Sequence, residues 1–233
     1  MPPDLNLRYV EHHFWKLDEL AEAVGTTTDL VQALITARCA PGPIYVLGKE
    51  GWWSALSDEP APPGEAWYAP GSAWGLRRAI LEMRNGVTAA AAASSLERLF
   101  ENDFAAALKR TEHAALAFPD CFDRQGRVTD EVGRAAQREW AAWLTGGYGV
   151  CLRIFNAQTC VAKEALGAAL KIALAREGYD AMALLPLAEA LAELILPFAP
   201  WQRSTGTPGL TIDRLLSDHK LGSERPMCSA DRC

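Results

Sequence analysis

Apolar residues recur at helical spacing in two short segments near the start of the chain. Leucine, alanine and valine at positions 17, 20, 21 and 24 fall on one helical face, and Gly25 is suited to end that helix. In the next segment Thr28 can cap a helix with apolar residues at positions 30, 31, 34 and 35. The pattern predicts two helices joined by a turn, and the apolar run 43–47 then predicts a short strand.

From residue 76 onward the apolar positions keep the helical period. They predict one helix that ends at Asn85-Gly86 and another that starts near Val87 or Ser94 and ends near residue 117. Glu97 lies three residues after Ser94, which fits a capping box and favours the later start. Further helices are predicted over 129–144, 157–178, 181–199 and 211–220. The fold class is therefore mainly α, with an N-terminal helix-turn-helix-like hairpin that carries a small wing, followed by a C-terminal helical bundle.

A change in composition separates these two parts. Residues 48–75 contain four prolines and four tryptophans, so the segment is predicted to be a linker without long helices. Tryptophan rings seldom remain in water, so the linker should be ordered, with its rings anchoring it to the body or lining a ligand groove. We divide the chain into a hairpin (1–50), a Trp/Pro-rich linker (51–75), a helical body (76–221) and a mobile tail (222–233).

Composition limits the function classes. The net charge of −6 gives no general attraction to nucleic acid or to an anionic membrane. The six cysteines show no C-x-x-C spacing and the first residues have no apolar signal core, which predicts a reduced, cytoplasmic protein. The longest apolar stretch, 181–199, is interrupted by proline and glutamate, so no membrane span is expected.

The N-terminal hairpin and its short strand resemble the helix-turn-helix and wing of MerR-type regulators. Residues 1–50, however, hold four basic and seven acidic residues. A DNA reader needs a basic footprint and polar or basic side chains on its second helix, where this chain offers mainly Gln32, Thr36 and Arg38. This charge balance disfavours DNA as a partner and favours a hairpin kept for packing or for protein contact.

Chemistry is concentrated in residues 137–166. The glycines at 146, 147 and 149 allow a positive φ or a close backbone approach, and Tyr148 lies among them. The following VCLRIF segment is predicted to be a short strand or a buried extended segment, and Asn156 can cap the next helix. The glycines match neither a phosphate loop nor a dinucleotide fingerprint.

Cys151 is the candidate catalytic residue. A cysteine nucleophile reacts as the thiolate, and Arg153, Lys163 and the helix that begins near Asn156 could stabilise that form. Its neighbours Val150 and Leu152 are apolar, which is typical of an inert, buried cysteine. Both interpretations are open on the sequence alone.

Other residues are candidates for binding a small polar metabolite. They are Tyr148, Arg153, Lys163, Glu164 and Arg203. Lys163 and Glu164 diverge by about 100° on a helix, so one can point inward while the other is solvated, or Lys163 can form an ion pair with a neighbouring helix. Adjacent charges on a helix are usually a surface or structural pair. Arg203 precedes a loop rich in serine, threonine and glycine, where it could bind a carboxylate or phosphate, or equally fasten the loop to a helix end.

No metal or cofactor is predicted. The four histidines form no H-x-x-x-H pair, the adjacent His12 and His13 cannot share one helical face, and the cysteines lack metal-finger spacing.

Several motifs together resemble a bacterial family of unknown molecular function found in natural-product biosynthesis gene clusters. They are F-W-K-L-D-E-L-A (14–21), R-x-x-P-G-P-I-Y (38–45), W-Y-x-P (67–70), W-L-x-G-x-Y-G-V-C-L (143–152), K-E (163–164) and F-A-P-x-x-R (198–203). The resemblance implies a role in making a specialised metabolite, but no fold, cofactor or reaction. The resulting expectation is a cytoplasmic biosynthesis protein that binds, and in one version transforms, a small polar metabolite. The alternatives are a DNA-binding regulator and a non-catalytic partner of a biosynthetic enzyme.

Overall fold

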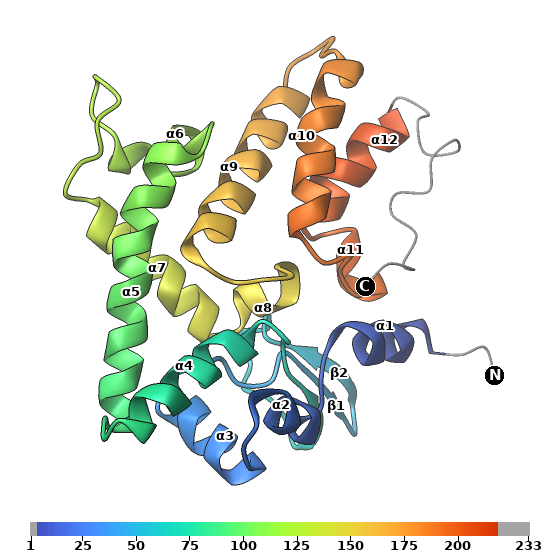
Figure 1. Cartoon of the computed structure of the whole chain (residues 1–233). Helices are drawn as coiled ribbons and strands as arrows, with labels where there is room; N and C mark the ends of the chain where they lie inside the picture. Colours follow the sequence, from blue (N-terminus) through green and yellow to red (C-terminus); the bar gives the residue numbers. More distant parts are fainter. Residues whose placement is uncertain (1–3, 219–233) are drawn as a thin grey trace.

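The computed structural model describes residues 4–218, and the tail predicted over 222–233 lies outside them. Figure 1 shows a helical body above a smaller N-terminal part that contains a three-stranded sheet, with α8 between them. The elements of the N-terminal part are α1 (Leu5–His13), α2 (Leu17–Val24), α3 (Thr28–Thr36), β1 (Tyr45–Gly48), β2 (Gly51–Ser54), β3 (Gly64–Trp67) and α4 (Ser72–Arg84). The elements of the body are α5 (Ala89–Arg110), α6 (Ala114–Ala117), η1 (Pro119–Cys121), α7 (Val132–Leu144), α8 (Gly147–Cys151), α9 (Ala157–Leu174), α10 (Ala181–Leu194), α11 (Pro200–Arg203), η2 (Gly209–Asp213) and α12 (Arg214–Asp218). The predicted mainly α fold is confirmed.

The hairpin α2–α3 forms as expected, with one shift at its cap. Gly25 ends α2 with a φ of +69°, a conformation that costs glycine little. The cap of α3 is Thr27, whose side chain accepts a hydrogen bond from the backbone N–H of Leu30, rather than Thr28. The helix α1, which the sequence reading did not predict, precedes this pair.

The Trp-rich segment contains strands. β1 pairs antiparallel with both β2 and β3, in the order β2-β1-β3. The segment predicted as an ordered linker, residues 51–75, thus contributes two strands to the sheet, which joins residues from both sides of position 50. Trp67 is buried and Trp52 packs against it, with ring centroids 5.3 Å apart. These rings anchor the segment, as one of the two alternatives expected.

Two other boundaries differ from the sequence prediction. The main helix α5 begins after Thr88, whose side chain caps it, so the alanine run lies inside the helix and Ser94 is not a cap. The VCLRIF segment was expected to be extended, but its first residues belong to the short helix α8. Only Leu152 forms an isolated bridge, with Ile195.

One hydrophobic core extends through both parts of the molecule. In the body, α9 packs against α5, α6 and α10, while α7 packs against α5 and α8. Within residues 4–218 no helix has the length and apolar character needed to cross a membrane.

Candidate functional site

The short helix α8 places Tyr148 between two long helices of the body, α7 and α9. Gly146 has a φ of +91°, which lets the chain leave α7 and turn directly into α8. At Gly149 the backbone comes close to the N-terminal part, because an added Cβ would lie 2.4 Å from Ile44 Cδ1. Glycine at this position thus permits the close approach that the sequence suggested.

Four polar side chains meet at this point, and we call them the Tyr148 cluster: Glu139, Tyr148, Lys163 and Glu164. The Tyr148 hydroxyl lies 2.5 Å from Glu139 Oε2 on α7 and 3.0 Å from Glu164 Oε1 on α9. Lys163 Nζ donates to the same Glu164 Oε1 at 2.6 Å. The cluster therefore forms a continuous row of hydrogen-bonding groups across three helices.

Local sequence explains how α9 presents its two residues. Asn156 caps the helix by accepting from the backbone N–H of Thr159 at 2.9 Å, as predicted, and this fixes where the helix starts. Lys163 and Glu164 are neighbours whose Cβ atoms diverge on the helix, yet their long side chains curl toward each other. Lys163 is largely buried, with 13% of its side chain exposed, whereas Glu164 keeps 34%. Glu164 is thus the more open of the two.

Burial and neighbouring charges shift the pKa values of the residues in the Tyr148 cluster. Burial raises the pKa of Glu139, and the nearby charge of Glu164 raises it further. Burial also raises the pKa of Tyr148. For Lys163, burial opposes the charged form, but Cys151 and the hydrogen-bonded Glu164 outweigh it, so the pKa is raised. Lys163 is therefore expected to be a protonated ammonium group bound to Glu164, and not a neutral amine nucleophile.

Cys151 lies beside this cluster but is closed to solvent. Only 6% of the residue is exposed, and burial raises the pKa of its thiol to about 11. Its Sγ lies 3.6 Å from the carbonyl oxygen of Gly147, to which the thiol can donate a weak hydrogen bond. These features favour the inert, buried cysteine over the nucleophile, because the reactive form is the thiolate.

A thiol-labelling experiment tests this assignment. In a variant with Cys228 and Cys233 replaced by serine, the remaining cysteines are the four that are buried in residues 4–218. We expect none of them to react with a soluble thiol reagent in the folded protein, and all four to react in urea. Mass spectrometry of the labelled protein gives the count. Rapid labelling of Cys151 in the folded state would restore the nucleophile hypothesis.

The two candidate arginines lie apart from the cluster. Arg203 Nε and Nη2 donate to the two carboxylate oxygens of Asp213 at 2.8 and 2.7 Å, and Nη1 donates to the Pro197 carbonyl at 2.6 Å. This geometry favours the role in fastening the loop to a helix over ligand binding. The Arg153 side chain is exposed, and its charge, after burial and His12, helps to lower the pKa of His13 to about 4.

Glu139 was not among the residues predicted from the sequence. On α7 it follows Val132 and Ala136 and precedes Trp143 at spacings of three to four residues, so it lies on the apolar stripe of the helix. A lone carboxylate on such a stripe is a signal for a buried polar partner, and it could have identified this residue.

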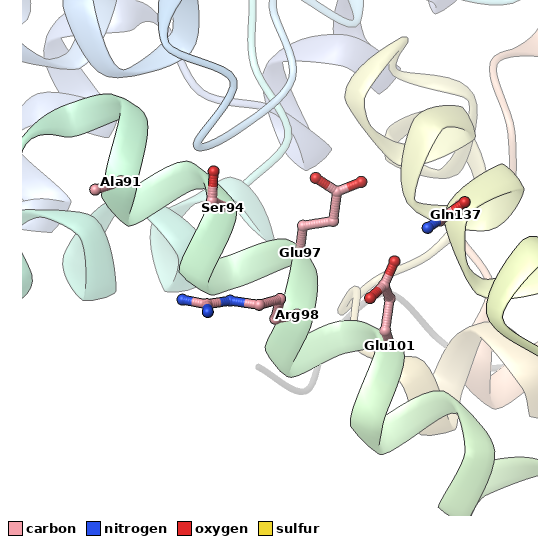
Figure 2. A pocket seen from close by; sticks show the side chains of 6 residues that line it. All are labelled: Ala91, Ser94, Glu97, Arg98, Glu101 and Gln137. Atoms are coloured by element: carbon pink, nitrogen blue, oxygen red, sulfur yellow. The ribbon is translucent and has the colours of Figure 1, made fainter.

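A separate surface groove of about 490 Å³ lies between α5 and α7. Figure 2 shows Glu97 and Glu101 pointing from α5 toward Gln137 of α7. The groove contains no member of the Tyr148 cluster. Neither it nor any other part of residues 4–218 brings together three side chains of the types that hold a metal ion.

Comparison with known proteins adds one finding. No curated protein and no solved structure matches this chain. The model of a family described as a family of unknown function, DUF6058, matches residues 96–220. This region is more than half of the chain and includes the whole Tyr148 cluster. The chain therefore belongs to this family of unknown function.

Proposed function

We propose that this protein binds a small polar metabolite at the Tyr148 cluster and acts in natural-product biosynthesis. The observation that carries the proposal is the meeting of two glutamates, a lysine and a tyrosine from three helices around one hydroxyl group. Perturbed titratable groups that converge in a partly buried place are typical of binding and catalytic sites. The metabolite would reach the cluster at Glu164, its more exposed member.

The helix-turn-helix alternative receives less support. The buried residues of α2 and α3 pack into the core, while the exposed side of α3 offers Asp29, Gln32 and Thr36. This face carries one acidic residue and no basic one, and exposed Arg38 follows the helix. It lacks the basic footprint that a phosphate backbone requires, so the hairpin suits packing better than DNA binding. The non-catalytic partner alternative relied on an exposed patch of tryptophans. Trp67 is buried and Trp52 stacks on Trp201 at 5.5 Å, whereas Trp74 keeps 46% of its surface exposed, so the Trp-rich segment offers one open ring and not a patch.

The experiment that tests the proposal is a metabolite profile of a producing strain with this gene deleted. We expect a discrete pathway intermediate to accumulate in the deletion strain. Complementation with the wild-type gene should remove it, whereas Glu164→Gln should not, because the substitution removes the charge at the open end of the cluster. Glu97→Gln is the matched control, since Glu97 is a partly buried glutamate in the separate groove.

Immunoblotting must show that all variants accumulate to similar levels. Loss of the product together with every intermediate would support regulation and overturn the proposal. Full complementation by Glu164→Gln would show that the cluster is not the binding site.

A further inference from the structure

If both glutamates are ionised, the Tyr148 cluster has fewer hydrogens than it has O···O contacts at the Tyr148 oxygen. Two O···O contacts, at 2.5 and 3.0 Å, meet at the Tyr148 oxygen, and each needs one hydrogen. The phenol supplies only one, and ionised carboxylates are acceptors without a donor. For each contact to have a hydrogen of its own, one glutamate carries a proton; the Cys160 thiol also interacts with the Tyr148 hydroxyl.

The surroundings decide which glutamate holds that proton. Glu164 Oε1 accepts from the Lys163 ammonium group at 2.6 Å, and an adjacent cation favours the ionised form of a carboxyl. Glu139 has no ion pair, and within residues 4–218 its hydrogen-bond partner is Tyr148. The proton therefore belongs on Glu139, with Glu139 donating to the Tyr148 oxygen and the Tyr148 hydroxyl donating to Glu164.

The charges around Glu139 agree with this arrangement. Burial is the largest influence and raises its pKa; the Glu164 charge raises it, whereas the Tyr148 hydrogen bond and two cations lower it. The titratable groups that act on or respond to Glu139 are Arg138 on α7, Tyr148 on α8, Cys160, Lys163 and Glu164 on α9, and Cys121 on η1.

We infer that Glu139, Tyr148 and Glu164 form a proton relay, loaded at Glu139 and able to deliver a proton to a metabolite bound at Glu164. Glu139 gives its proton to the Tyr148 oxygen, the hydroxyl proton of Tyr148 passes to Glu164 Oε1, and Glu164 protonates the ligand. One O–H bond breaks at Glu139 and one bond to hydrogen forms on the ligand, without oxidation or reduction. The ligand is accordingly a molecule with a proton-accepting atom, such as a carbonyl oxygen or an amine nitrogen.

In this scheme Glu164 is the residue that touches the ligand, while Glu139 and Tyr148 act through it as positioning residues. Lys163 favours the ionised form of Glu164 before proton transfer, so Glu164 can accept the proton from Tyr148. Delivery to a ligand rests on the proposed function, whereas the loaded state of Glu139 exists in the free protein.

Infrared spectroscopy of the free protein tests the loaded state. At neutral pH we expect the carbonyl band of one protonated carboxylic acid in the wild type, its loss in Glu139→Gln, and its retention in Glu97→Gln. The amide introduced by Glu139→Gln can still donate to the Tyr148 oxygen, so the variant should keep its fold. Tyr148→Phe, which leaves Glu139 in place without its acceptor, should shift the band in frequency.

Absence of the band from the wild type would overturn the relay. So would a band that remains in Glu139→Gln, or one whose frequency is unchanged in Tyr148→Phe.

The pH dependence of the free energy of unfolding gives a second readout. A raised folded-state pKa means that the folded protein keeps a proton that the unfolded chain releases. The stability of wild type relative to Glu139→Gln should therefore be greatest below the ordinary carboxyl pKa and decline as the pH rises through the raised value. No decline would count against the relay.

The two proposals fail separately. Absence of the carboxylic acid band removes the relay and leaves metabolite binding standing. Full complementation of the deletion strain by Glu164→Gln removes metabolite binding at the cluster, even where the band is present.

Discussion

Replacing Phe155 with alanine is expected to lower the free energy of unfolding by about 3–5 kcal/mol, the usual loss for a large buried aromatic residue. Phe155 is 3% exposed and lies in the link between α8 and α9. Its ring stacks on Trp143 at 4.3 Å and on Phe100 at 5.2 Å, and it also contacts Tyr148 at 5.4 Å. The substitution leaves a cavity where α5, α7 and α8 meet. Urea denaturation followed by circular dichroism measures the change.

Ile154→Ala is the matched control, because this neighbouring side chain is 62% exposed. Its removal should change the free energy of unfolding by less than about 0.5 kcal/mol, as is usual for surface positions. Similar losses for the two variants would mean that the link does not pack as described. Replacing Phe155 should also make the position of Tyr148 less well defined. The carboxylic acid band of Glu139 should therefore broaden in this variant.

Tyr148→Phe is expected to cost about 1–3 kcal/mol, the range for leaving buried polar groups without their partner. The substitution keeps the ring and removes only the hydroxyl, which contacts Glu139 Oε2 and Glu164 Oε1. Glu139 accounts for most of the expected cost, because it is half-buried and loses the Tyr148 hydroxyl, its hydrogen-bond partner among the described residues. Denaturation at neutral pH measures the loss.

Tyr68→Phe is the control for this change. Tyr68 is also a buried tyrosine, but its hydroxyl makes no hydrogen bond to any residue between 4 and 218. Its loss should therefore have little effect on the free energy of unfolding. Equal effects of the two substitutions would show that the Tyr148 hydroxyl does not hold the cluster together.

Local signals in the sequence predicted much of the fold. Gly25 and Asn156 have the short-range roles of ending and starting a helix, and both act as expected. Ser94 failed as a cap because the alanine run before it has the highest intrinsic helix propensity and extends the helix back to Thr88. The sequence predicted a small wing after the hairpin, but not that residues 51–54 and 64–67 supply two of its strands, because proline and glycine are abundant between them.

The candidate site was predicted only in part, for a similar reason. The sequence singled out Tyr148, Lys163 and Glu164, and the structure brings them together with Glu139. Periodicity alone assigns adjacent helical residues to diverging faces, and it could not show that Lys163 and Glu164 pair. Their long side chains meet because a buried ammonium group needs an acceptor, and Glu164 is the acceptor within reach.

The contact between Gly149 and Ile44 bears on how the chain can be divided. Ile44 stands before β1, outside the matched region 96–220, yet it abuts the helix that carries Tyr148. Tyr45 adds a hydrogen bond to Gln202 at 3.0 Å across the same boundary. The region matched by the family model thus packs against residues outside it, and without them the Gly149 side of α8 would lose its contact with Ile44. We therefore expect the two parts to fold as one unit.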